Sequence, residues 1–386
     1  MFVYVFAHLS KIIAGPGTVI PELHPALSWQ LSTKSSGCQP QPQGPAVLDS
    51  EWRWVHAVDS YSNRITKNSW DFSLCSNPAT CAKNCELGGI DYTQFGTTTS
   101  SNSLTLRPTQ TNYKSGSRVY LIANETSYQL FKLKNQELRF DVDAGNIPWG
   151  FGGGLYFGQM DADSSRYGTY CNEIDIWEAN SYSTVSIANP CTVQGQTRCS
   201  GSECTSYCDS DGCDFNPYRL GNLTYYGHNM NVGTEKKITV VTQFITADNT
   251  TTSALGEIRR LHIQNGKVIQ NAKSLVAELS NCDFIIEKYF SAQNVAFSDP
   301  DVFASKGGFQ ALGDASDSGL ILVMSVSGNG VTQMRWLDSV YRLTVHGPTL
   351  ALLEGFAKTL PVESQPMASV TFSNLRFGDI GLTYSS

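Results

Sequence analysis

The sequence has little charge, no long apolar run and no basic excess, and each absence removes a class of protein. Charged residues make up only 16% of the 386 positions, and the net charge is -7. An acidic chain lacks the positive field that attracts phosphate backbones, so we expect no nucleic-acid partner. No apolar run reaches the length of about 18 residues that a membrane-spanning helix needs, so we expect no membrane partner.

Linkers, repeats and a convincing secretory signal are missing too. No proline-rich linker, low-complexity tail or repeat divides the chain, which predicts one domain over residues 17–386 without an appended binding module. The apolar segment 1–16 is short, lacks a basic beginning and contains His8 and Lys11, so it is a poor signal peptide. We treat it as a degraded or mispredicted leader.

Cysteine, in contrast, is abundant. The chain has 11 cysteines crowded into a few windows, and N-x-[ST] sequons begin at Asn124, Asn222 and Asn249. Both features are typical of secreted proteins, so we expect an extracellular, disulfide-bonded glycoprotein. A set of free structural thiols is the alternative, and the odd total leaves at least one cysteine without a partner in the chain.

The composition and the hydrophobic pattern predict an all-β fold. Gly, Ser, Thr, Asn and Tyr are plentiful, as in chains of short strands joined by tight turns. Apolar and polar residues alternate over 130–134 and 138–143, which predicts a hairpin turning at Asn135 and Gln136. Helical periodicity is scarce, and only 275–279 and 349–358 are expected to form short helices.

Two kinds of strand indicate two stacked sheets. Residues 238–244 and 369–372 alternate, as strands with one buried face do, whereas 320–324 is continuously apolar and predicts a strand buried on both faces. A two-layer sandwich accommodates both kinds.

The stretch CNEIDIWEAN, residues 171–180, places three acids among Ile and Trp. Residues two apart share a strand face, so Glu173 and Asp175 point the same way and Glu178 falls out of phase. One extra residue near Ile176 and Trp177, a β-bulge, would bring Glu178 onto the face of the other two. A calcium site or a solvated polar face are the alternatives, but the interleaved apolar residues favour a buried opposite face.

Three neighbouring carboxyl groups cannot all ionise cheaply, so one is expected to keep its proton while another is anionic. Glycoside hydrolysis needs these two states, and a retaining mechanism needs a nucleophile and an acid/base carboxyl about 5–5.5 Å apart. Two glutamates on a bulged strand fit this spacing. Such chemistry uses carboxyl groups alone, so we expect no cofactor and no metal.

Aromatic residues elsewhere predict sugar binding. Trp52 and Trp54 are two apart and would share one strand face, where flat rings can stack on pyranose rings, although a place in the core is the alternative. Trp336 and Arg118 are weaker signals. The acidic run 208–214 is similar to a calcium loop but lacks its closing Glu, so we expect a structural turn.

Together these motifs resemble glycoside hydrolase family 7, the fungal-type cellobiohydrolases and endoglucanases. The similarity runs in order from about His24 to the end of the chain. It rests on WRWVHAV, CAKNCELGG, RFDVDAGNIP, LYFGQMDAD, NEIDIWEANS, CDSDGCDFNPYRLGN, KKITVVTQF, QNGKVI, RWLDS and VTFSNLRFGDIG. The family fold is a curved, antiparallel β-sandwich of the jelly-roll type with a concave cellulose-binding groove, in agreement with the all-β pattern.

The resemblance implies a role for each site residue. Glu173 resembles the family nucleophile and Glu178 its acid/base, with Asp175 tuning the nucleophile. Other matched positions line the groove: Trp52 and Trp54 on the glycone side, Trp336 on the aglycone side, Arg118 and Tyr156 as polar groups along it, and Arg260 near the product. Cellulose or cello-oligosaccharides are the implied partners, and a monomer is expected.

Departures from the family are also visible. The connection from LYFGQMDAD to the catalytic strand lacks a segment that family members carry, and Asn189 stands where the family has a histidine. The resemblance implies four disulfides, Cys75–Cys81, Cys191–Cys208, Cys199–Cys204 and Cys213–Cys282, and leaves Cys38, Cys85 and Cys171 without their family partners. The leading hypothesis is a retaining β-1,4-glucanase of the cellobiohydrolase type. An open-cleft endoglucanase and a non-catalytic cellulose-binding jelly roll are the alternatives.

Overall fold

A computed structural model describes most of the chain. The described residues are 22–41, 44–58, 60, 65–66, 69–74, 76–110, 115–124, 126–162, 171–197, 199, 206–279, 282–328, 334–338 and 368–384. The expected leader, 1–16, and the expected helix 349–358 lie outside them.

Two large β-sheets form the body of the molecule, and neighbouring strands are antiparallel almost throughout. Sheet I has the order β1 (Ala26–Leu27), β4 (Gly44–Leu48), β12 (Ser115–Asn124), β25 (Leu320–Gly328), β16 (Phe151–Gly158), β17 (Glu173–Ala179), β18 (Thr184–Asn189) and β19 (Cys213–Phe215). The short strands β11 (Thr109–Gln110) and β13 (Ser127–Tyr128) pair with β12, and β14 (Leu130–Phe131) pairs with β25.

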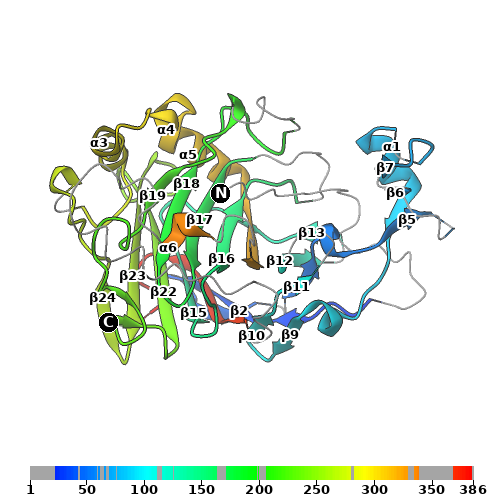
Figure 1. The fold of residues 1–386 in the computed structure, drawn as a ribbon, viewed down its shortest axis with the longest axis horizontal. Coiled ribbons are helices and arrows are strands. Elements are labelled where there is room, and N and C mark those ends of the chain that lie inside the picture. Colours follow the sequence, from blue (N-terminus) through cyan, green and yellow to red (C-terminus); the bar gives the residue numbers. More distant parts are fainter. Residues whose placement is uncertain are drawn as a thin grey trace.

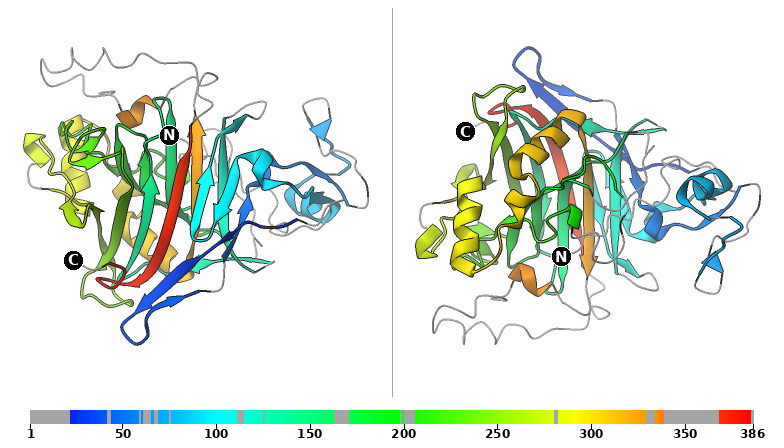
Figure 2. Two further views of the ribbon diagram at one scale, coloured as in Figure 1. Left: turned by 90° about the horizontal axis from the view of Figure 1, so that it is seen from below. Right: turned by 90° about the horizontal axis from the view of Figure 1, so that it is seen from above.

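Sheet II has the order β24 (Lys267–Gln270), β23 (Leu255–Gln264), β22 (Ile238–Thr246), β15 (Gln136–Asp143), β26 (Val370–Asp379), β10 (Ser103–Leu106) and β9 (Thr97–Ser100). The strand β2 (Trp29–Thr33) runs parallel beside β26 and carries β3 (Gly37–Pro40). Figure 2 shows β25 in orange and β26 in red in neighbouring layers, each central to its own sheet.

Smaller elements decorate the two ends of the sandwich (Figure 1). At one end lie α3 (Glu287–Phe297), α4 (Val302–Ser305) and α5 (Gly308–Ser318); at the other lie β5 (Val55–Ala57), β6 (Ile65–Thr66), β7 (Ser69–Trp70), β8 (Cys85–Leu87) and α1 (Pro78–Asn84). The remaining elements are β20 (Tyr226–Gly227), β21 (Val232–Gly233), α6 (Arg335–Asp338) and the 3-10 helices η1 (Ser50–Trp52), η2 (Tyr92–Phe95) and η3 (Ala277–Leu279). No helix in the described part is long and apolar enough to cross a membrane.

The core lies between the sheets, where inward-facing residues of both interlock. Leu155 and Phe157 of sheet I and Phe140 and Phe372 of sheet II are at most 1% exposed and belong to one cluster. A second cluster covers the opposite face of sheet I and includes Val323. The strand β25 is therefore buried on both faces, as its continuous apolar run predicts.

Most of the predicted strands form, but the predicted hairpin is wrong. Residues 238–244 lie in β22, and residues 370–372 of the expected strand 369–372 lie in β26. Leu130 and Phe131, in contrast, pair with β25 in sheet I, while β15 pairs with β22 and β26 in sheet II. The turn at Asn135 thus carries the chain from sheet I to sheet II. The alternation of apolar and polar residues alone does not predict which sheet a strand joins. The expected helix over 275–279 is the short η3, and the helices α3 and α5 were not expected.

The cysteines confirm one predicted disulfide and contradict another. Cys191 and Cys208 are bonded, with Cα atoms 4.0 Å apart. Cys81 and Cys199 are disulfide-bonded as well, and their predicted partners lie outside the described residues. Cys38 and Cys171 form no disulfide, as expected. The predicted Cys213–Cys282 bond is absent: both are thiols, Cys213 fully buried in the core and Cys282 at its edge.

Candidate active site

The strand β17 carries a bulge that aligns its three acids. Asp175 lies opposite Tyr156 on β16, but Trp177, two residues later, lies opposite Leu155, so β17 has one residue in excess. The pairing with β18 shifts within the same interval, between Asp175 and Glu178. The predicted bulge is confirmed, and Glu173, Asp175 and Glu178 share the outer face of sheet I.

Core packing holds the bulge in place. Trp177 is fully buried, and its ring packs edge to face on Phe140 and Phe372 of the opposite sheet. Gly153 on β16 leaves room for it, because a Cβ atom there would lie 3.1 Å from the ring and 3.0 Å from Ile147. The bulge thus turns Trp177 into the core and the acids away from it.

A transverse row of small residues lies beside Glu178. Residues directly opposite each other on antiparallel strands point to the same face. Glu178 faces Gly154, Gly154 faces Ser325, and Ser325 faces Arg118 on β12. The row therefore forms a strip with large side chains at its two ends, Glu178 and Arg118, and only Gly154 and Ser325 between them.

The three carboxyl groups are buried, and burial dominates their electrostatics. Glu173, Asp175 and Glu178 are 8%, 3% and 7% exposed. Burial, and then the charge of Glu178, raises the pKa of Glu173 to about 8; burial raises the pKa of Glu178 to about 7. Burial and the two glutamates raise the pKa of Asp175 well above its usual value. A group that keeps a proton near neutral pH can act as a general acid.

Arg118, Tyr156 and Trp52 lie on the same side of sheet I as the acids. The Arg118 guanidinium donates to Asp49 through Nε (3.1 Å) and Nη2 (2.9 Å) and lies 5.7 Å from the centre of the Trp52 ring. The buried Tyr156 hydroxyl has no hydrogen-bond partner among the described residues. Burial raises the pKa of Tyr156 well above its usual value, and the charges of Glu173 and Asp175 add to this effect. Tyr156 lies directly opposite Asp175, so the two side chains share one face of sheet I.

The two tryptophans do not share a strand face, so this geometric prediction is wrong. Trp52 ends the 3-10 helix η1 and is 8% exposed, packed in the core. Trp54 lies beyond η1, is 42% exposed, and packs on His56 with ring centres 4.5 Å apart. A tight turn replaces the expected strand, and only Trp54 offers an open aromatic surface.

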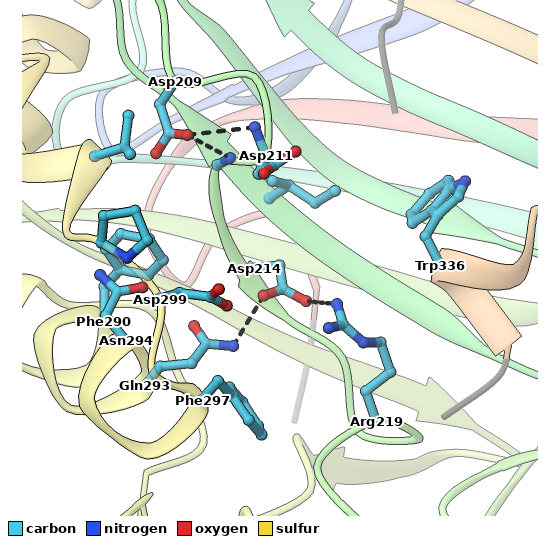
Figure 3. Close-up of a pocket in the computed structure, with 14 residues that line it drawn as sticks. Asp209, Asp211, Asp214, Arg219, Phe290, Gln293, Asn294, Phe297, Asp299 and Trp336 are labelled. Atoms are coloured by element: carbon cyan, nitrogen blue, oxygen red, sulfur yellow. Dashed lines mark hydrogen bonds and ion pairs between the residues drawn. The ribbon is translucent and has the colours of Figure 1, made fainter. Parts of the chain in front are cut away.

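Sequence reasoning missed a pocket of about 230 Å³ at β18, the strand that pairs with the catalytic strand β17 (Figure 3). Ile187, which faces Asp175 across β17 and β18, lines it, as does Trp336. Figure 3 shows α3 on one side of Asp214 and Trp336 on the other. The aglycone platform predicted at Trp336 therefore borders a cavity close to the catalytic strand.

The polar wall of this pocket comes from the run 208–214, for which we expected only a structural turn. The turn exists: Asp209 Oδ1 accepts from the backbone N–H groups of Asp211 (3.3 Å) and Gly212 (3.0 Å). The same segment also presents Asp214, which accepts from Arg219 at 3.1 Å and Gln293 at 2.8 Å. The acidic residues of the run 208–214 and the RWLDS motif were the sequence features from which the pocket could have been predicted.

Arg260 does not reach the acids. It lies on β23 in sheet II, is 1% exposed, and donates from Nη1 to Thr184 Oγ1 at 3.3 Å. Its Nε and Nη2 atoms have no partner among the described residues, and burial lowers its pKa to about 10. No group of three or more His, Cys, Asp or Glu in the described part is arranged to hold a metal ion.

Comparison with known proteins gives one consistent result. The sequence profile of glycosyl hydrolase family 7 matches residues 16–166 and 164–384. The two matched segments meet at residues 164–166. This is the connection in which we expect the chain to lack a segment that family members carry.

Solved structures of this family are similar over nearly their whole length. A family 7 cellobiohydrolase from Daphnia pulex is 32% identical, with a TM-score of 0.82, and 95% of this chain and 99% of that chain are covered. A variant of an endocellulase from Humicola insolens is 30% identical (TM-score 0.79; 94% and 98% covered). A cellobiohydrolase from Melanocarpus albomyces, solved with cellotetraose, is 30% identical (TM-score 0.79; 95% and 98% covered).

Proposed function

Because the chain belongs to glycosyl hydrolase family 7 and is a retaining glycosidase that cleaves the β-1,4-glucosidic bonds of cellulose, we propose that Glu173 is its nucleophile and Glu178 its general acid and base. The observation that carries this assignment is the bulge in β17, which aligns both glutamates with Asp175 on one face of sheet I. An unbulged strand would turn Glu178 into the core.

In the first step Glu173 attacks the anomeric carbon while Glu178 gives its proton to the departing glycosidic oxygen. A covalent glycosyl-enzyme forms and the shortened chain leaves. Glu178, now anionic, then takes a proton from water, and the water oxygen displaces Glu173 from the sugar. The first step takes one proton from Glu178 and the second returns one, so water is the only co-reactant.

Burial favours the protonated form of both glutamates, and this suits the role of Glu178. Burial keeps Glu178 protonated up to about pH 7, so it enters the cycle as an acid. Asp175 hydrogen-bonds to Glu173, and this bond lowers the pKa of Glu173 against the effect of burial. Asp175 is thus the positioning group of the nucleophile.

The groove residues have different roles in this proposal. Trp54 and Trp336 present ring surface to the glycone and aglycone sides, whereas Arg118 and Tyr156 offer polar contacts along the strip beside Glu178. The Trp52 ring packs against the Arg118 guanidinium and supports it. Arg260 contacts product only if its side chain moves out of the interior, since it is 1% exposed.

We propose cellobiohydrolase-type attack, with open-cleft endo attack as the alternative. The similar structures include both kinds of enzyme. The ratio of soluble to insoluble reducing ends released from amorphous cellulose separates them, because an endo enzyme leaves more new ends in the insoluble fraction. We further propose that the chain is monomeric and secreted; the Cys191–Cys208 bond and the sequons support secretion.

External azide provides the decisive test of the assignment. Azide should rescue Glu173→Ala on an activated aryl cellobioside as the α-glycosyl azide, and Glu178→Ala as the β-glycosyl azide, because only the second retains the nucleophile. Glu173→Gln is the control without rescue. If wild type and Glu173→Gln release product equally slowly while both bind cellulose, the protein is a non-catalytic cellulose-binding jelly roll and the proposal fails.

A further inference from the structure

A second, larger cavity of about 630 Å³ lies away from the acids, where the start of β15 and the end of α5 meet β2 and β14. None of the residues assigned to the active site lines it. Its size falls within the range of about 300–1,000 Å³ that is typical of small-molecule sites. Neither the catalytic mechanism nor the groove accounts for it.

The lining of this cavity combines an aromatic floor with a polar rim. Trp29 and Phe377 pack against Phe131, with ring centres 5.3 and 5.0 Å away. The rim carries side-chain amides and hydroxyl groups, from Gln41, Gln129, Gln136, Thr251 and Thr252, together with Lys132 and an ion pair between Lys134 and Asp317. Aromatic surface plus neutral amides is the chemistry that recognises a sugar.

The sequon at Asn249 opens directly onto this rim. Asn249 is exposed in the connection between β22 and β23, and Thr251, the hydroxyl residue of its sequon, lines the cavity. The Asn249 carbonyl oxygen accepts a hydrogen bond of 2.7 Å from Asn135, which stands between the lining residues Lys134 and Gln136. The backbone of the acceptor asparagine is therefore anchored at the cavity edge.

The side chain of Asn249 is available for modification. Its backbone has a φ of 60°, a left-handed conformation that asparagine tolerates well. Thr250 forms the hydrogen bonds of the turn: its N–H and hydroxyl donate to Asp248, and its carbonyl accepts from Thr246. The Asn249 amide makes no hydrogen bond within the part of the chain that the structure describes.

We propose that Asn249 carries an N-linked glycan whose first N-acetylglucosamine residues seat in this cavity. The Asn249 amide nitrogen forms the bond to C1 of the sugar, the polyprenyl diphosphate of a lipid-linked oligosaccharide leaves, and the amide proton is lost. The acetyl methyl group and the sugar face cover the aromatic floor, and the hydroxyl groups pair with the amide rim. The proposal rests on secretion of the chain and is independent of the catalytic assignment.

Thr251 variants test the site without disturbing the backbone at Asn249. Thr251→Ala removes the sequon, and Thr251→Ser retains it as a matched control. Each full chain is made behind a yeast secretion leader and, separately, in a bacterial host with an oxidising cytoplasm, which adds no N-glycan. Glycopeptide mass spectrometry measures occupancy at Asn249, and thermal unfolding measures Tm.

We expect Asn249 to be occupied in secreted wild type and Thr251→Ser. Thr251→Ala should lower Tm by a few degrees in the yeast-made protein and leave it unchanged in the bacterial protein, because only the glycan differs. An endoglycosidase should release the Asn249 glycan several-fold more slowly from native than from denatured protein, since release requires the seated sugars to leave the cavity.

Other outcomes overturn the proposal in distinct ways. An unoccupied Asn249 in secreted wild type excludes the modification. Equal release rates from native and denatured protein, or an equal Tm change in both hosts, exclude binding of the first sugars in the cavity. Glu173→Gln, which abolishes catalysis, should leave every one of these results unchanged, so failure of the glycan proposal and failure of the catalytic proposal are told apart.

Discussion

Asp175 donates a hydrogen bond from its carboxyl group to the carboxylate of Glu173, two residues earlier on β17. Burial raises the pKa of Asp175 well above its usual value, so Asp175 holds the proton. The bond lowers the pKa of Glu173, which burial and the charge of Glu178 otherwise raise. The proton on Asp175 therefore favours the anionic form of the nucleophile, against burial, which still raises the pKa of Glu173 to about 8.

Two substitutions of Asp175 should distinguish the effect of its hydrogen bond from the effect of its carboxyl group. Asp175→Asn keeps a donor and should retain most of kcat. Asp175→Ala loses a bond to a charged group, worth about 1.5–3 kcal/mol, so kcat should fall by roughly 10- to 100-fold with little change in KM. The acid limb of its pH–rate profile should move upward, because Glu173 loses the bond that lowers its pKa. Equal losses in both variants would contradict the positioning role.

Glu178 should make the protein less stable as the pH rises. Its folded pKa of about 7 lies above the ordinary value of 4.5, so the folded state binds the proton more tightly than the unfolded state. Below pH 4.5 Glu178 is protonated in both states, and its ionisation costs no folding free energy. This cost grows as the pH rises and reaches up to about 3 kcal/mol above pH 7. Glu178→Gln should therefore raise Tm by several degrees at pH 7.5.

At pH 4 the same comparison should give nearly equal Tm values, because Glu178 is then protonated in both states. Calorimetry of wild type and Glu178→Gln at the two pH values makes the comparison. Stabilisation of the same size at pH 4 would point to packing and not to proton linkage.

The Tyr156 hydroxyl should serve the substrate and not the fold. It is buried without a partner among the described residues, so Tyr156→Phe removes an unsatisfied group and should leave Tm unchanged or slightly higher. If the hydroxyl bonds to the sugar, kcat/KM on cello-oligosaccharides should fall about tenfold, the value of a bond near 1.4 kcal/mol. A lowered Tm with unchanged kcat/KM would reverse this assignment.

Gly153 should control the bulge through Trp177. Gly153→Ala places a Cβ atom 3.0–3.2 Å from Ile147, Trp177 and Val370, which forces the core to shift and should cost about 1–3 kcal/mol of unfolding free energy. The displaced Trp177 should also disturb Glu178 and lower kcat. Gly256→Ala on β23, where a Cβ atom meets nothing within 4 Å, is the matched control.

Denaturant unfolding and initial rates on a chromogenic cellobioside measure both effects. Loss of stability at Gly153→Ala without loss of kcat would show that the bulge tolerates a displaced Trp177.

Local sequence determined the strands and the orientation of the acids along β17. Side chains alternate on every strand, so the spacing of Glu173, Asp175 and Glu178 already required one extra residue to bring them together, and the structure contains it. The continuous apolar run of β25 likewise determined burial on both faces, because only a central strand with covered faces tolerates it.

Tertiary structure alone decided which distant segments meet. Alternation over 130–143 is the same whether the two strands pair with each other or join different sheets, and long-range packing placed Leu130 in sheet I and Leu138 in sheet II. The pocket at Trp336 depends on α3, whose sequence has little amphipathic pattern, and Trp52 is withdrawn from the surface by the turn of η1. Spacing in sequence specifies one face of one element, whereas a site made by several elements depends on how they pack.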